Sequence, residues 1–207
     1  MYTYLALGDS YTIGEQVEGD QNFPAQTVAK LRRQFALAVE QPQIIATTGW
    51  TTDELSAAIK EQQLKGTFDF VTLLIGVNNQ YRGRDTDNYS KEFAQLLSKA
   101  ILFAGGKTSR VFVLSIPDWG VTPFAEGKDR KEIADAIDSY NKLNRSITLA
   151  YRCHYLDITN STREHGTDES YLTPDKLHYS EKEYAQWATL LAPEIVKQIK
   201  PEALKAD

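Results

Sequence analysis

The sequence has one cysteine, Cys153, among 207 residues, so no disulfide within the chain and no cysteine metal cluster can form. Basic residues are not in excess: the net charge is −5 and no basic run stands out, which argues against a nucleic-acid partner. No stretch approaches the roughly eighteen apolar residues of a membrane helix, so we expect no integral membrane association. The N-terminus also lacks the pattern of a signal peptide. We therefore expect a cytoplasmic protein, although a trimmed secreted form would read the same way.

What is present is the composition of an ordinary folded protein. Hydrophobic residues make up 42% and charged residues 25% of the chain, which excludes a disordered or fibrous class. A chain of this length fits one domain with a substantial core. Because no internal repeat, low-complexity tract or linker interrupts it, we predict a single domain over residues 1–207. Three histidines at these separations make no plausible zinc site, so we expect neither a metal nor a cofactor.

Short apolar segments alternate along the chain with longer segments of helical periodicity. One helical segment has Val28, Leu31 and Phe35 at helical spacing, and another opens with a capping box, Thr51 to Glu54. A second capping box, Ser180 to Glu183, opens the last helix, and a further helix is expected from Phe93 to Phe103. This alternation predicts an α/β fold with a five-stranded parallel sheet and helices on both faces. The expected strands are residues 3–8, 42–47, 68–76, 110–116 and 153–158.

The carboxyl ends of these strands are where we expect the functional residues. In open parallel sheets, ligands bind beyond that edge. The segments that follow the expected strands are Asp9 and Ser10, then Thr48 to Trp50, then Val77 to Gln80, then PDWGVTPF, and last a long loop that finishes in Asp175 to His178.

These segments contain every group that acyl transfer needs. Ser10 supplies a hydroxyl nucleophile, and His178 a base whose residue type titrates near neutrality. Asp175 can orient the histidine. Gly49 can offer an unobstructed N–H and Asn78 an amide to a developing oxyanion. Each residue alone has a simpler interpretation as a turn former or a solvated loop residue, but their convergence on one edge favours a catalytic site.

Three other polar residues are interpreted as non-catalytic. We expect Asp9 to shape the turn before the serine by hydrogen bonding. His154 lies inside an expected strand and is interpreted as a packed histidine, whereas His165 follows Glu164 in a polar stretch and is expected to be solvated. Neither histidine has an aspartate three residues before it, as His178 has.

The segments GDSYTIG, TTGWTT, GVNN and DKLH together resemble the four blocks of the GDSL, or SGNH, hydrolases. The resemblance implies a three-layer α/β/α, flavodoxin-like sandwich and serine esterase chemistry without a cofactor. It makes Ser10 the nucleophile and also an oxyanion donor, together with Gly49 and Asn78. It makes His178 the base and Asp175 its orienting carboxylate.

Three positions depart from the family's usual residues. Asn79 stands where an aspartate is common, so any charge there is missing. Tyr11 replaces the leucine after the serine, and Tyr179 replaces the proline after the histidine. None of these changes removes a catalytic group, but the tyrosines are expected to reshape the pocket.

The sequence predicts a small-molecule ester as the substrate, with a small or medium acyl group because no apolar lid segment is visible. Tyr11, Trp50, Tyr81 and Trp119 are expected to line the site, and Asn79 to contact the substrate. A carbohydrate O-acetylesterase, a lysophospholipase and a thioesterase remain alternatives, as do an acyltransferase and a non-catalytic binding domain. The sequence does not indicate an oligomeric state.

Overall fold

The computed structural model describes residues 1–200 and contains one five-stranded sheet in which every pair of neighbouring strands is parallel. The strand order is β2-β1-β3-β4-β5, so β1 lies inside the sheet, β2 forms one edge, and β3 to β5 extend the sheet to the other edge. Residues 201–207, included in the predicted domain, lie outside the described residues. Each predicted strand is present, with shorter bounds: β1 Tyr4–Gly8, β2 Gln43–Ala46, β3 Phe70–Leu74, β4 Val111–Leu114 and β5 His154–Leu156.

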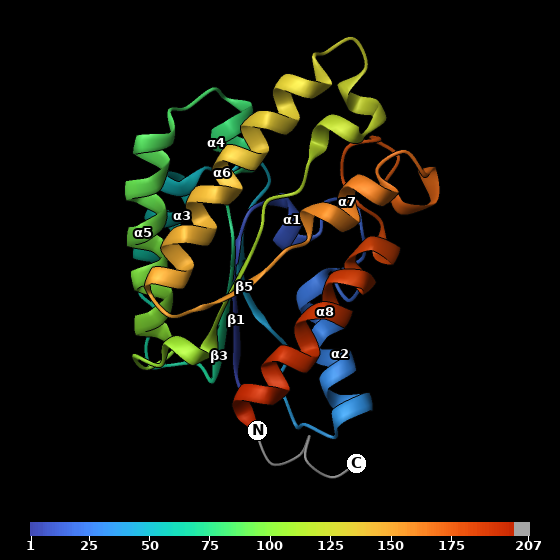
Figure 1. Ribbon diagram of the computed structural model, residues 1–207. Helices are drawn as coiled ribbons and strands as arrows, with labels where there is room; N and C mark the ends of the chain where they lie inside the picture. Colours follow the sequence, from blue (N-terminus) through green and yellow to red (C-terminus); the bar gives the residue numbers. More distant parts are fainter. Residues whose placement is uncertain (201–207) are drawn as a thin grey trace.

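Helices cover both faces of this sheet, which Figure 1 shows nearly edge-on. Helices α2 and α8 lie on one face, and α3, α5 and α6 on the other. The predicted three-layer, flavodoxin-like fold class is confirmed. The helices are α1 Ser10–Ile13, α2 Phe23–Phe35, α3 Thr52–Gln62, α4 Val77–Tyr81, α5 Thr86–Phe103, α6 Arg130–Ala150, α7 Thr159–His165 and α8 Glu181–Ile199, and the 3-10 turns are η1 Thr108–Arg110, η2 Trp119–Val121, η3 Pro123–Ala125 and η4 Glu169–Tyr171.

The central strands β1 and β3 are buried along their whole length. Their nearly continuous apolar sequences fit a sheet that is covered on both faces. On the α2 and α8 face, the fully buried Trp187 packs against Phe23, with ring centroids 5.9 Å apart. Two helices that are far apart in sequence are therefore joined through one large aromatic contact.

Helix starts agree only in part with the sequence predictions. The capping box at Thr51 is present, because the Glu54 carboxylate accepts a hydrogen bond from the Thr51 N–H. At the start of α8, Ser180 caps the helix, but Glu183 turns inward to Trp187, so the second capping box is wrong. Helix α5 begins seven residues earlier than expected, because Asp85 caps the N–H of Asn88.

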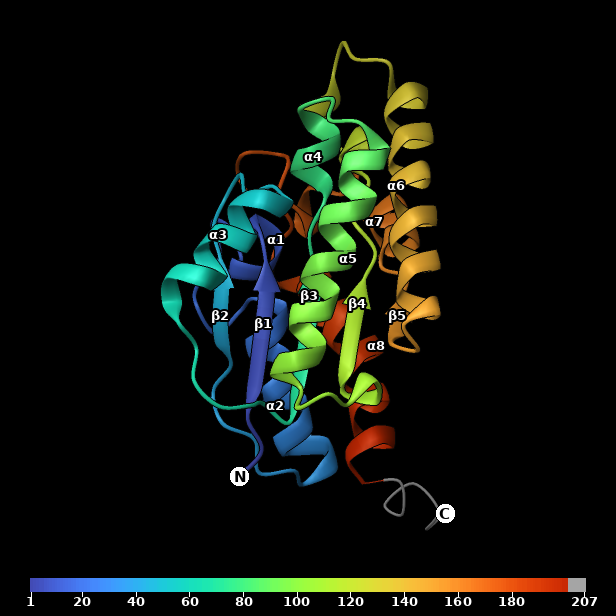
Figure 2. The ribbon, with the colours of Figure 1, turned by 90° about the vertical axis from the view of Figure 1, so that its left-hand side faces the viewer.

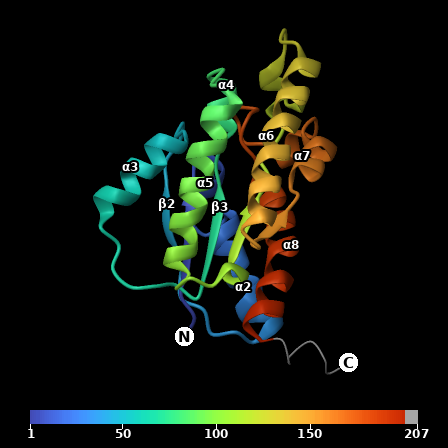
Figure 3. The same cartoon turned by 60° about the vertical axis from the view of Figure 1, so that its left-hand side comes forward.

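The strands all end at the same edge of the sheet, and the short helices α1 and α4 stand there (Figures 2 and 3). The N-terminus lies at the opposite end of the sheet. Over residues 1–200, no helix combines the length and the apolar character that a membrane crossing requires. The fold therefore places the predicted site residues at one edge, where the loops after the strands meet.

Candidate active site

Ser10 is the first residue of α1, directly after strand β1. Asp9 caps this helix by accepting a hydrogen bond from the Tyr11 N–H over 3.0 Å, which is the turn-shaping role expected from the sequence. Gly8 lets the turn approach β3 closely, because a Cβ at this position would lie 2.5 Å from the Leu74 carbonyl oxygen. The same Cβ would lie even closer to the Thr12 hydroxyl, so a larger residue at position 8 would force the turn that carries Ser10 to shift.

His178 and Asp175 form a close pair in the loop before α8. The His178 Nδ1 atom lies 2.7 Å from the Asp175 Oδ2 atom. Partial burial of Asp175 opposes its ionisation, but hydrogen bonds from the side chain and backbone of His178, from the Leu177 N–H and from the Thr173 hydroxyl outweigh this and lower its pKa to about 2. Asp175 is therefore an anion at every pH near neutrality, and it can hold the histidine with Nδ1 as the donor.

The loop after β2 and the helix after β3 bring two candidate oxyanion donors together. Gly49 has a φ of +86°, a conformation that favours glycine. The Arg82 guanidinium donates to the Gly49 carbonyl oxygen over 2.7 Å and so holds the peptide group between Gly49 and Trp50, which is next to the one that carries the Gly49 N–H. The Asn78 amide donates one N–H to the Trp50 carbonyl oxygen over 2.9 Å. Since an amide has two N–H groups, the other is left for a ligand.

Ser10, Gly49, Asn78 and His178 border one cavity of about 180 Å³. Four of its lining residues were not among the predicted site residues, although each lies in a segment that follows an expected strand, namely Thr48, Val77, Phe124 and Leu177. Phe124 lies in the loop after β4, and the strand-edge rule that singled out that loop could have found it. The other lining residues are Ser10, Tyr11, Gly49, Asn78, Tyr81, Trp119 and His178.

One wall of the cavity is aromatic. The ring centroids of Tyr81 and Trp119 are 5.2 Å apart, and those of Trp119 and Phe124 are 6.2 Å apart. Trp119 is buried, and its indole N–H donates to the Gln80 side-chain oxygen over 2.7 Å. Tyr81 and Phe124 are 51% and 40% exposed, so they stand at the rim. This wall, defined as Tyr81, Trp119 and Phe124, is called the aromatic wall below.

Two expected substrate contacts are corrected by the structure. Asn79 is fully buried, where its amide accepts from the Thr52 N–H and donates to the Thr52 hydroxyl. An asparagine can serve both hydrogen bonds, and it joins the starts of α3 and α4 instead of facing the cavity. Trp50 also does not line the cavity, because it packs partly buried against the core and contributes its carbonyl oxygen to Asn78.

The other two histidines lie away from the cavity. His154 stacks on Phe112 with ring centroids 4.9 Å apart, as expected for a packed strand residue. The expectation of a solvated His165 is wrong. This residue ends α7, and its Nδ1 lies 2.7 Å from the buried Glu183 carboxylate. Periodicity could not reveal this pairing, because α7 and the loop to α8 are too short to show a pattern.

The pKa of Asp9 is shifted in the opposite direction to that of Asp175. Burial is the largest influence on it and raises its pKa to about 7, although the hydrogen bond from the Tyr11 N–H opposes this shift. Its Oδ2 atom is buried without a hydrogen-bond partner among the described residues. Two carboxyl groups next to proposed catalytic residues therefore have pKa values shifted in opposite directions.

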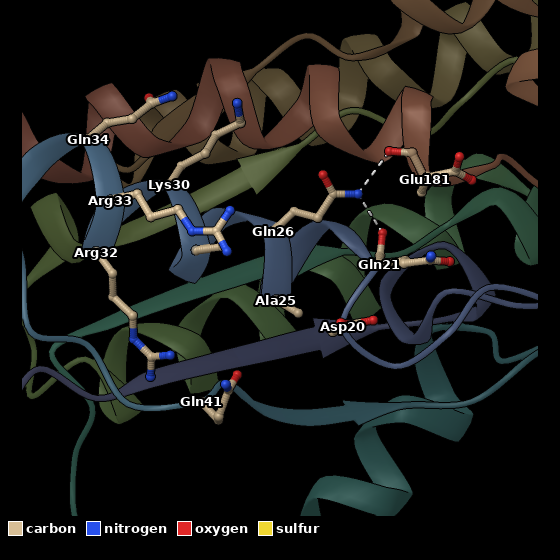
Figure 4. Close-up of a pocket in the computed structure, with 11 residues that line it drawn as sticks. Asp20, Gln21, Ala25, Gln26, Lys30, Arg32, Arg33, Gln34, Gln41 and Glu181 are labelled. Atoms are coloured by element: carbon tan, nitrogen blue, oxygen red, sulfur yellow. Dashed lines mark hydrogen bonds between the residues drawn. The ribbon is translucent and has the colours of Figure 1, made fainter.

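A larger hollow of about 570 Å³ lies on the outer face of α2 (Figure 4). Apart from Ala25 and Ala29, its lining side chains are polar or charged, and they include no pairing of a nucleophile with a base. Gln26 crosses it to donate to the backbone carbonyls of Gln21 and Glu181. Within residues 1–200, no group of three His, Cys, Asp or Glu side chains is placed to hold a metal ion. The smaller cavity at the strand ends is therefore the candidate active site.

The fold is a doubly wound α/β sandwich, and comparisons with known proteins identify the family. A family profile described as GDSL-like Lipase/Acylhydrolase matches residues 6–186. The chain therefore belongs to the GDSL-like lipase/acylhydrolase family, as the four sequence blocks predict. A comparison with curated proteins finds no match.

Solved structures share the fold over nearly the whole chain. The lipase/acylhydrolase from Enterococcus faecalis has 20% identity and a TM-score of 0.70, covering 98% of this chain and 99% of its own. Axe2, an acetylxylan esterase from Geobacillus stearothermophilus, has 18% identity and a TM-score of 0.70, covering 100% and 97%. The acetyl xylan esterase AlAXEase has 16% identity and a TM-score of 0.73, covering 93% and 99%. At these identities the likeness concerns the fold.

Proposed function

We propose that the protein is a serine esterase that hydrolyses carboxylic esters of small or medium acyl groups through an acyl-enzyme on Ser10. The observation that carries the proposal is the convergence of Ser10, His178, Gly49 and Asn78 on one cavity. The His178–Asp175 pair supports it, because a base held in one tautomer is what the activation of a serine requires.

In the proposed reaction, the Ser10 hydroxyl attacks the ester carbonyl carbon while His178 takes its proton. The resulting oxyanion is stabilised by the N–H groups of Ser10 and Gly49 and by the Asn78 amide. The tetrahedral intermediate then expels the alcohol, which leaves with the proton from the histidine. Water next adds to the acyl-enzyme with the same histidine as base, and the acid is released from Ser10.

The size of the cavity supports a short acyl group. A volume of about 180 Å³ is below the roughly 300–1,000 Å³ of pockets that enclose drug-sized ligands, so it favours a short chain. The buried face of Trp119 closes part of this space, and Gln80 holds the indole in place. Esters from acetyl to hexanoyl are therefore expected to fit, and longer chains to extend past the rim.

The test is hydrolysis of p-nitrophenyl esters from acetyl to lauroyl by the wild type and by Ser10→Ala. We expect turnover by the wild type that peaks at or below hexanoyl and falls by at least about 10³-fold in Ser10→Ala. Equal inactivity of both proteins on every ester would contradict the proposal and favour a non-catalytic binding domain. A peak at lauroyl would contradict the short acyl group alone.

The exposed rim of the aromatic wall favours a sugar as the alcohol half, which makes a carbohydrate O-acetylesterase the second candidate. Tyr81 and Phe124 present ring faces of the kind that pack against sugar rings, and two of the structurally similar proteins described above are acetylxylan esterases. Release of acetate from acetylated xylooligosaccharides would distinguish this candidate from a simple esterase. Added alcohols that capture the acyl group in preference to water would instead indicate an acyltransferase.

A further inference from the structure

The turn after α1 brings Gln16 to the Asp175 carboxylate, although the two residues are 159 positions apart in the sequence. The Gln16 Nε2 atom donates to Asp175 Oδ2 over 3.0 Å. The same oxygen lies 2.7 Å from His178 Nδ1. The glutamine amide therefore contacts the carboxylate oxygen that holds the proposed base.

The remaining hydrogen bonds of Asp175 come from its own loop. Its Oδ1 atom accepts from the Thr173 hydroxyl at 2.8 Å, the Leu177 N–H at 2.9 Å and the His178 N–H at 3.0 Å. These bonds shape the loop internally and do not place it relative to Ser10. Among residues 1–200, Gln16 is the one side chain outside this loop that hydrogen-bonds Asp175.

Gln16 is also held close to the nucleophile. The N–H of the preceding residue, Glu15, donates to the Ser10 carbonyl oxygen over 3.0 Å. Gln16 itself has a φ of +64°, a left-handed conformation that costs a residue with a side chain about 1 kcal/mol or more. The fold keeps an unfavourable backbone conformation at the position that connects the Ser10 turn to the Asp175 loop.

Resting on the proposed function, we propose that Gln16 is a positioning residue that fixes the Asp175–His178 pair relative to Ser10. Its amide holds Oδ2 from the side of the Ser10 turn, while His178 contacts the same atom. Losing the amide leaves the loop's own hydrogen bonds, the Phe124 N–H bond to the Lys176 carbonyl oxygen and the packing of Tyr11 on His178 in place. It removes the one side-chain hydrogen bond between the Ser10 turn and the Asp175 carboxylate, so the carboxylate can shift against the nucleophile. Because small misplacements of reacting groups slow catalysis strongly, the loss should appear in kcat.

The test compares Gln16→Ala and Gln16→Gly with a matched pair, Gln63→Ala and Gln63→Gly. Gln63 is an exposed glutamine at the end of α3 with a φ of +43°, so it shares the backbone conformation of Gln16 without lying near the cavity. We expect both Gln16 variants to lose about 5- to 20-fold in kcat on a short p-nitrophenyl ester, with KM within about twofold. The Gln63 variants should keep the wild-type kcat.

Comparing the alanine and glycine variants distinguishes the effect of losing the hydrogen bond from the effect of the strained backbone at position 16. Glycine adopts a positive φ without cost, so Gln16→Gly should have the higher thermal midpoint while showing the same loss in kcat as Gln16→Ala. A return of kcat to the wild-type value in Gln16→Gly would overturn the proposal. A rise in KM with kcat unchanged would overturn it as well.

Gln16→Glu provides a third test of the hydrogen bond, because it keeps the size of the side chain but places a carboxylate against Asp175. We expect its kcat to fall at least as far as that of Gln16→Ala, and wild-type kcat in this variant would overturn the proposal. Failure of the proposed function looks different: the wild type and Ser10→Ala would then be equally inactive. Wild-type turnover that depends on Ser10 but not on Gln16 would contradict the positioning role alone.

Discussion

Two histidine–carboxylate pairs in this protein have the same length and different surroundings. His178 Nδ1 lies 2.7 Å from Asp175, and His165 Nδ1 lies 2.7 Å from Glu183. His178 borders the cavity that also contains Ser10, and Asp175 is 26% exposed. Glu183 is instead fully buried, and the His165 ring stacks on Tyr171 with centroids 4.0 Å apart.

The two pairs differ in the other hydrogen bonds that each carboxylate accepts. The second oxygen of Glu183 accepts from the Ser161 hydroxyl at 2.6 Å and from the Trp187 indole N–H at 2.8 Å, which joins α7 to the inner face of α8. The Asp175 carboxylate holds only its own loop and Gln16 within the described part of the chain. A histidine–carboxylate pair is thus a candidate for catalysis only where a nucleophile and open space adjoin the histidine ring.

The largest expected effect comes from exchanging each histidine for alanine. His178→Ala removes the proposed base and should lower kcat by about 10³- to 10⁶-fold, with little change in thermal midpoint. His165→Ala should keep kcat within about twofold and lower the thermal midpoint, because Glu183 is left buried without that partner. The measurement is ester hydrolysis and thermal unfolding of both variants. Equal loss of activity in the two would contradict the assignment of a catalytic role to His178 and a structural role to His165.

Replacing the two carboxylates, Asp175 and Glu183, should likewise affect activity in one case and stability in the other. Asp175→Ala should lower kcat by about 10²- to 10⁴-fold, because the histidine loses the group that orients it. Glu183→Ala should cost about 3–5 kcal/mol of stability, because it leaves Trp187, Ser161 and His165 without a shared buried partner. Urea unfolding at constant pH measures the second effect. An Asp175→Ala variant as unstable as Glu183→Ala would show that both carboxylates are structural.

A smaller effect concerns Asp9, a third carboxyl group, which has no histidine partner. Its folded-state pKa of about 7 lies above the ordinary value, so the folded protein holds this proton more tightly than the unfolded chain. Stability should therefore fall as the pH rises between about 4 and 7. From pH 5.5 to 8.5 the expected loss is about 2 kcal/mol, or a midpoint shift of about 4–8 °C.

Asp9→Asn should remove this part of the pH dependence, because an amide does not ionise. The measurement is thermal unfolding of the wild type and the variant at both pH values, since the two proteins differ only at position 9. The same pH dependence in both proteins would show that Asp9 stays ionised throughout.

The sequence predicts the parallel sheet and the order of its functional loops because both depend on local patterns. Apolar segments such as the one that contains β3 mark the strands, and Ser10, Gly49, Asn78 and His178 each follow a strand or stand before a helix. The errors at Glu183 and His165 concern long polar side chains whose partners are distant in the chain. Glu183 looks like a capping residue in its own segment, and only the packing of α7 against α8 shows that it contacts His165 instead.

Asn79 illustrates the same limit at the site itself. It lies next to Asn78 in sequence, but in a short helix adjacent residues point in different directions. One amide borders the cavity, and the other is buried against Thr52. Predicting which of the two side chains lines the cavity therefore requires knowing that α4 is a helix. Its five residues have no clear periodic pattern, so the sequence does not predict this helix.

Helix α4 also has a consequence for anyone who redesigns this protein. Within one and a half turns it carries Asn78, then Gln80, which fixes Trp119, and then Tyr81 at the rim. Substitutions in this helix aimed at a new acyl or alcohol group would therefore disturb the proposed oxyanion donor and should alter turnover and selectivity together. Phe124 lies on a separate loop after β4. A library randomised at position 124 should change substrate preference while leaving the rate on the best substrate nearly intact.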